Sequence, residues 1–128
     1  MERIWVYARI PGCPQDTENQ LAEMAQKAEQ AGCQVVGRSL DVHHGWWRRP
    51  GLRKMIRHIR KGDVDRVYID SIGSISHSNS HNIWFLKQMS RCQVKVQAMQ
   101  YNIAFRARQH GYELSTWALQ KGLDIPWD

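Results

Sequence analysis

The sequence predicts an α/β domain: a three-layer sandwich with a mostly parallel sheet of four or five strands between helices. Runs rich in β-branched residues alternate along the chain with runs whose apolar residues recur every three or four positions. Such alternation is typical of a parallel sheet covered by helices on both faces. The chain has 128 residues, 42% of them hydrophobic, which suffices for one packed core. Ligands of such sheets bind in the loops beyond the carboxyl ends of the strands.

The first strand and helix lie within the first 32 residues. Residues 3–10 are rich in aromatic and β-branched side chains and predict a strand. Thr17-Glu18-Asn19-Gln20 has the pattern of a capping box, which predicts that a helix begins there. Apolar residues at helical spacing continue from Leu21 to Ala28, and Gly32 is a natural stop for this helix.

The second strand and helix follow directly. Residues 33–40 predict a strand, and residues 41–49 predict a loop. Pro50 suits the first turn of a helix because its ring presets a helical φ angle. We expect this helix to end near Gly62. Its predicted buried stripe comprises Leu52, Met55, Ile56 and Ile59.

The second half of the chain repeats the alternation once more. We expect a strand over residues 64–69, a polar loop over 71–81, a helix over 83–89 and a strand over 94–99. Residues 105–120 carry apolar side chains that predict a further, weaker helix.

Charge and composition restrict the class of partner. The net charge of +6 favours a polyanion such as nucleic acid. The three cysteines, Cys13, Cys33 and Cys92, are scattered and odd in number, which fits a reducing cytoplasm better than a disulfide framework. No spacing typical of metal ligands and no glycine-rich phosphate loop appears, so we expect neither a metal nor a cofactor. No apolar run is long enough to cross a membrane.

Several separated motifs give the chain a resemblance to a known family. The first strand reads Tyr7-Ala8-Arg9-Ile10, and the loop and helix after it carry Gln15 and Gln20. Asp41 is followed by Arg49-Pro50-Gly51-Leu52. Over residues 3–105 the chain thus resembles the catalytic domain of serine recombinases of the resolvase/invertase family. The resemblance implies a resolvase-like fold and a place in DNA recombination, often on mobile elements.

The resemblance also implies that this chain lacks part of the family's catalytic machinery. In that family a serine attacks the DNA phosphate, and arginines neutralise the transition state. Pro11 occupies the position of the serine, and proline has no nucleophile. The family's Asp-Arg-Leu-Gly-Arg segment aligns so that Ser74 and His77 replace two arginines. We therefore expect a pseudoenzyme with no confidently assigned catalytic residue.

Six residues of the family's site remain, and we expect them to form a phosphate-binding or DNA-binding pocket. Arginine suits this role because its guanidinium matches the oxygens of a phosphate. The alternative is that Arg9 forms an internal ion pair with Asp41 and binds nothing. The six residues are Tyr7, Arg9, Gln15, Gln20, Asp41 and Arg49.

A basic helix over residues 50–61 is the second candidate for DNA binding. Arg53, Arg57 and Arg60 share one face, and no acid lies between Asp41 and Asp63. This face would follow a DNA backbone without reading its sequence. The alternative is an ordinary solvated helix face.

The chain divides by the resemblance into a catalytic-like domain, residues 1–105, and a C-terminal helix and tail, residues 106–128. No separate DNA-binding domain is expected after residue 105. We therefore consider homodimerisation, or a recombinase or other protein partner, beside binding to the DNA backbone.

Two other functions stay open. One is an active strand-transfer recombinase with a displaced nucleophile, for which Cys13 and the nearby serines are candidates. The other is a stand-alone phosphate-binding module that keeps only the sheet and the pocket.

Overall fold

This computed structural model describes residues 2–10, 13–42, 48–99, 103–108 and 111–115. One sheet holds six strands in the order β2-β1-β3-β4-β5-β6. The first four pair in parallel, whereas β5 and β6 are antiparallel to their neighbours. The strands are β1 (Arg3–Arg9), β2 (Gln34–Asp41), β3 (Arg66–Ile69), β4 (Lys95–Ala98), β5 (Ile103–Arg108) and β6 (Gly111–Ser115). The helices are α1 (Pro14–Gln30), α2 (Pro50–Arg60) and α3 (Asn79–Arg91), with a short 3₁₀ turn η1 (Ile72–Ser74).

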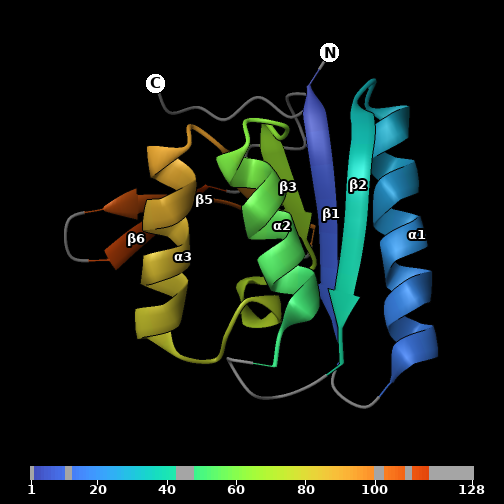
Figure 1. The fold of residues 1–128 in the computed structure, drawn as a ribbon, viewed down its shortest axis with the longest axis horizontal. Coiled ribbons are helices and arrows are strands. Elements are labelled where there is room, and N and C mark those ends of the chain that lie inside the picture. The colour runs from blue at the N-terminus through green and yellow to red at the C-terminus, as the bar shows by residue number, and fades with distance from the viewer. Residues whose placement is uncertain (1, 11–12, 43–47, 100–102, 109–110, 116–128) are drawn as a thin grey trace.

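Helices cover the sheet on both faces and so confirm the predicted α/β sandwich. Helices α2 and α3 lie in front of the strands in Figure 1 and share one apolar cluster with side chains of β1, β3 and β4. Helix α1 packs on the opposite face against a second cluster that includes Ile4, Val6 and Tyr68. The stripe predicted for α2 is confirmed, since Leu52, Met55, Ile56 and Ile59 are buried.

Two glycines allow β2 to approach its neighbours closely. A Cβ on Gly51 would lie 2.9 Å from the carbonyl carbon of Leu40, nearer than real Cβ atoms come to backbone. A Cβ on Gly37 would run into the indole ring of Trp5. The indole nitrogen of Trp5 donates to Ser39 Oγ at 3.0 Å, and that hydroxyl donates to the Gly51 carbonyl at 2.8 Å. These contacts fix the first turn of α2 against the end of β2.

The predicted capping box is wrong. Helix α1 begins at Pro14, which takes the first-turn position, and Cys13 is its N-cap residue. Thr17 therefore lies inside the helix, where its hydroxyl donates back to the Cys13 carbonyl at 2.8 Å. The preference of proline for the first turn outweighs the weaker Thr-x-x-Gln signal.

The helix predicted over residues 105–120 is also wrong where the structure describes it. Backbone pairing places β5 beside β4 and β6 beside β5, as an antiparallel hairpin. Its first strand alternates as Ile-Ala-Phe-Arg-Ala-Arg, a period of two that suits a strand. Residues 116–120 lie outside the described residues. The predicted division between residues 105 and 106 falls within β5 and stays a prediction.

None of the described helices is long and apolar enough to span a bilayer.

Candidate functional site

A buried polar cluster joins the carboxyl ends of β1 and β2 to the start of α2. The Tyr7 hydroxyl donates to Asp41 Oδ2 at 2.6 Å. Arg49 donates to the same hydroxyl from Nε at 3.0 Å and from Nη2 at 2.6 Å. Arg49 Nε also forms an ion pair with Asp41 Oδ2 at 3.5 Å, and the guanidinium carbon lies 5.6 Å from the centre of the Tyr7 ring. The sequence motifs therefore predicted three residues that do meet in space.

Asp41 also caps α2. Its two carboxylate oxygens accept the backbone N–H groups of Gly51 and Leu52, each at 2.9 Å. The first N–H groups of a helix lack partners within the helix, and a carboxylate there is favoured by the helix dipole. Because Asp41 is 3% exposed, its charge is balanced inside the protein by these donors and by Arg49.

Arg49 and the neighbouring Arg9 both hold the backbone of the loop after β3. Arg9 donates to the carbonyl of Gly73 at 2.8 Å and to that of Ser74 at 3.3 Å. Arg49 donates to the carbonyls of Ser74 and Ile75, each at 2.6 Å. The loop that the resemblance aligns with the family's arginine segment thus supplies oxygen acceptors at this place. Sequence reasoning missed these acceptors because any residue type carries a backbone carbonyl.

The protein environment shifts the pKa of two of these groups, Tyr7 and Arg9. Burial raises the pKa of the Tyr7 phenol, against the opposing effect of the Arg49 charge, so the phenol is neutral and able to donate. Burial and the nearby Arg49 charge lower the pKa of the Arg9 guanidinium. Two cations held so close together in the interior suit an anionic neighbour, and Asp41 supplies that charge.

The chemistry available to Arg49 is restricted by its contacts. All three of its guanidinium nitrogens already donate to oxygens of the protein, and the residue is only 1% exposed. A phosphate would compete for Arg49 with the carbonyls of Ser74 and Ile75. The geometry therefore suits a structural role for Arg49 better than a ligand-binding one.

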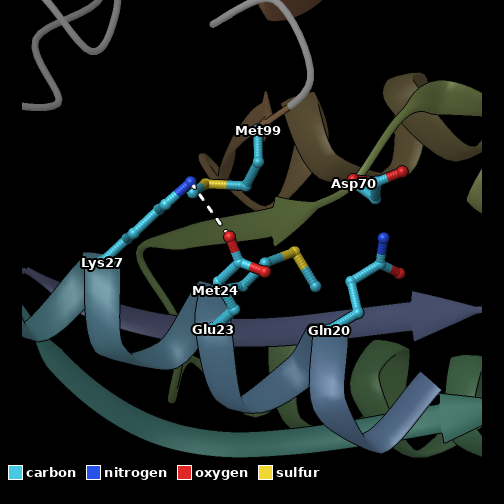
Figure 2. Close-up of a pocket in the computed structure, with 6 residues that line it drawn as sticks. All are labelled: Gln20, Glu23, Met24, Lys27, Asp70 and Met99. Atoms are coloured by element: carbon cyan, nitrogen blue, oxygen red, sulfur yellow. Dashed lines mark ion pairs between the residues drawn. The ribbon is translucent and has the colours of Figure 1, made fainter. Parts of the chain in front are cut away.

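The two predicted glutamines lie elsewhere on α1. Gln15 is exposed, and its amide donates to Asn19 Oδ1 at 3.1 Å. Gln20 lines a cavity of about 200 Å³, where its amide faces Asp70 (Figure 2). Its Oε1 is buried without a hydrogen-bond partner. The lining consists of Gln20, Glu23, Met24, Lys27, Asp70 and Met99 and so includes none of the buried cluster.

Pro11, which takes the position of the family's nucleophile by resemblance, lies outside the described residues. Cys13, the weak candidate nucleophile, is exposed at the start of α1. Its backbone N–H donates to the Ile10 carbonyl at 3.2 Å. Its role in catalysis stays a prediction. In the described part of the chain, no group of three or more His, Cys, Asp or Glu residues could hold a metal ion.

The basic surface predicted on α2 is present. Arg53, Arg57 and Arg60 are exposed on the helix, opposite its buried stripe, and Lys54 and Lys61 are exposed beside them. Within the described ranges, none of these five side chains forms an ion pair. Their charges are therefore available to an anionic partner.

Comparisons with known proteins agree with this architecture. A family model, described as the N-terminal domain of resolvase, matches residues 4–120. The catalytic domain of an IS607-like serine recombinase, ISC1926 TnpA, is similar with a TM-score of 0.71 and 22% identity, over 77% of this chain and 69% of that one.

Two further solved structures are similar. The N-terminal catalytic domain of TP901-1 integrase has a TM-score of 0.71 and 17% identity, covering 80% of this chain and 81% of that one. A resolvase-family site-specific recombinase from Streptococcus pneumoniae has a TM-score of 0.66 and 16% identity, covering 81% and 76%. No curated protein sequence matches the chain.

Proposed function

The chain belongs to the resolvase N-terminal domain family, and from this premise we propose that it binds the DNA backbone without cutting the strand. Binding would be directed by charge and not by base sequence, through the exposed cations of α2. The buried cluster of Tyr7, Asp41 and Arg49 would serve to hold α2 and the loop after β3 in place.

The observation that carries the proposal is the contrast between the two sets of arginines. In the family, arginines act on the reacting phosphate, and such charge stabilisation is usually the largest catalytic contribution. Here the guanidinium of Arg49 is buried and donates to Tyr7, Ser74 and Ile75, while the arginines of α2 are exposed and without ion pairs in the described ranges. The positive charges available to DNA therefore lie on the surface of α2 and not in the buried cluster of Tyr7, Asp41 and Arg49.

The sequence supports the absence of cleavage at the same time. By resemblance, Pro11 replaces the attacking serine, and Ser74 and His77 replace two arginines. Losing a nucleophile and its electrostatic partners together removes two different contributions to catalysis. Cys13 is the alternative nucleophile, so the experiment has to include it.

The test combines binding and cleavage on the same preparation. We expect labelled duplex DNA to bind, by fluorescence anisotropy, with an affinity that falls steeply as salt is raised. The triple variant R53A/R57A/R60A should weaken binding and flatten the salt dependence. The matched control is R38A, which removes an exposed arginine of β2 that lies beside α1.

Supercoiled plasmid should stay uncut over a range of salts and metal ions. Nicking, or a covalent protein–DNA adduct that disappears in C13A, would instead establish the displaced-nucleophile alternative. No binding of duplex DNA at low salt would overturn the proposal, and a recombinase or other protein partner would then be sought.

A further inference from the structure

The cavity beside Gln20 lies between α1 and the carboxyl ends of β3 and β4, on the face of the sheet opposite α2 (Figure 2). Its lining contains none of the cations of α2 and none of the buried cluster of Tyr7, Asp41 and Arg49. A volume of about 200 Å³ corresponds to about seven water molecules in the liquid. A ligand of this cavity is therefore small, and the lining determines its chemistry.

The charged groups of the lining leave one carboxylate uncompensated. Glu23 Oε1 forms an ion pair with Lys27 Nζ at 3.6 Å, the dashed line in Figure 2. The other carboxylate is that of Asp70, and no described residue forms an ion pair with it. The wall that α1 supplies belongs to a helix with four acids and one lysine. The cavity is therefore negatively charged in a protein whose net charge is +6.

The uncharged groups of the lining fit a ligand with N–H donors and an apolar stem. The amide of Gln20 faces Asp70, and its Oε1 is buried without a hydrogen-bond partner. A buried acceptor without a donor is unfavourable, and the terminal torsion of glutamine is broad, so this amide can turn toward a donor in the cavity. Met24 and Met99 supply adaptable apolar walls beside these acceptors.

We propose that this cavity binds a guanidinium or ammonium group on a short alkyl stem, with its N–H groups on Asp70 and Gln20 and its stem against the two methionines. A guanidinium matches a carboxylate with two parallel hydrogen bonds, and such charge-assisted bonds are roughly twice as strong as neutral ones. A Ca²⁺ or Mg²⁺ ion fits less well, because these ions need more oxygen ligands than two carboxylates supply, and Glu23 is already paired with Lys27.

The same chemistry has two sources. The cation is either a free small molecule or the side chain of an arginine or lysine of a partner protein. Neither source involves the cations of α2, so this inference does not depend on DNA binding.

The first test uses methionine methyl groups as reporters. Carbon-13 methyl spectra of the full chain follow titrations with propylguanidinium and with propylurea, which has as many non-hydrogen atoms but no charge. We expect propylguanidinium to shift the signals of Met24 and Met99 saturably, with a Kd on the order of 1 mM for so small a ligand. Met55 and Met89 are internal controls, because they lie in the apolar cluster on the other face. Equal effects of the two ligands, or no saturable shift with either, would overturn the proposal.

Variants then locate the charge that the ligand recognises. D70N removes the charge at nearly constant shape and should weaken propylguanidinium binding by roughly 10-fold to 100-fold. Q20E adds a carboxylate opposite Asp70 and should tighten it. E29Q is the matched control, since Glu29 is an exposed acid of α1 outside the cavity. Circular dichroism checks that each variant folds. If neither D70N nor Q20E changes the affinity, the inference is wrong.

A third ligand separates the two sources. Arginine blocked as N-acetyl and N-methylamide carries the same guanidinium on a peptide backbone. If it shifts Met24 and Met99 with an affinity similar to that of propylguanidinium, the cavity accepts an arginine side chain of a partner. If propylguanidinium binds and the blocked arginine does not, the ligand is a free small cation. Both results support the proposal, and the absence of shifts with both ligands contradicts it.

Discussion

Arginine occurs in two different environments in this chain, and the two environments lie one helical turn apart. Arg49 is buried just before α2, and its guanidinium is bonded to Tyr7 and to the loop after β3. Arg53 and Arg57 lie on the outer face of the same helix, exposed and without ion pairs in the described ranges. Burial requires that a charge be paired, and only an exposed charge can be offered to a partner. A count of basic residues therefore overstates the charge available for binding.

The largest effect is expected from removing the buried guanidinium of Arg49. R49M should lower the free energy of unfolding by about 3–5 kcal/mol, since it leaves the buried Asp41 carboxylate without its ion-pair partner Arg49 and removes the hydrogen bonds to Tyr7, Ser74 and Ile75. Urea unfolding measures the loss. The matched control is R57M on the exposed face of α2, which should stay within about 0.5 kcal/mol of wild type. Equal effects of the two variants would show that Arg49 has no special structural role.

The next prediction concerns Gly51, where the first turn of α2 packs against the end of β2. G51A forces a Cβ against the carbonyl of Leu40, which is backbone and cannot rotate away. We expect a loss of about 1–3 kcal/mol in the free energy of unfolding, as for other overpacked sites. G73A is the control, because its added Cβ would meet only ordinary contacts at 3.5 and 3.9 Å. An unchanged G51A would mean that β2 and α2 are packed less tightly than the structure has them.

The exposed region is tested by binding. For R53A/R57A/R60A we expect roughly a tenfold loss of duplex affinity and a salt slope shallower by about one for each phosphate contact removed. Urea unfolding should differ little from wild type, since the three side chains are solvated. If stability falls while affinity holds, the assignment of the two roles is reversed.

The sequence predicted the exposed region more completely than the buried one. Helical periodicity separates Arg57 from Ile56 without further information, and the structure confirms both positions. The motifs also brought Tyr7, Asp41 and Arg49 together correctly. The acceptors for Arg49 could not be predicted, because the carbonyls of Ser74 and Ile75 leave no mark in the sequence.

The other errors have physical causes of the same kind. The prediction for α1 used the Thr17 pattern alone, whereas the helix begins three residues earlier, at Pro14. The hairpin β5–β6 depends on pairing with β4, a contact between segments that a local periodicity does not report. Local patterns thus predicted which residues face solvent, and distant backbone contacts determined the rest.

The smallest expected effect concerns Arg3, which is more exposed than Arg49 and less exposed than the arginines on the outer face of α2. Arg3 pairs with Asp65 at 3.0 Å, and both side chains are about two-fifths exposed, at 42% and 39%. Hydrogen bonds from the Arg3 side chain and backbone hold the pKa of the Asp65 carboxyl below its usual value. A lowered pKa in the folded state means that the stabilisation is complete above the unfolded-state pKa, about 3.9, and is lost as the pH falls through the folded-state value.

D65N should therefore lower Tm slightly at neutral pH, by a few degrees at most because solvent and salt screen the pair. The difference between wild type and D65N should disappear in acid, below the lowered folded-state pKa of Asp65. Thermal melts from neutral to acid pH measure this, and a difference that persists undiminished in acid would mean that the asparagine disturbs packing and not charge.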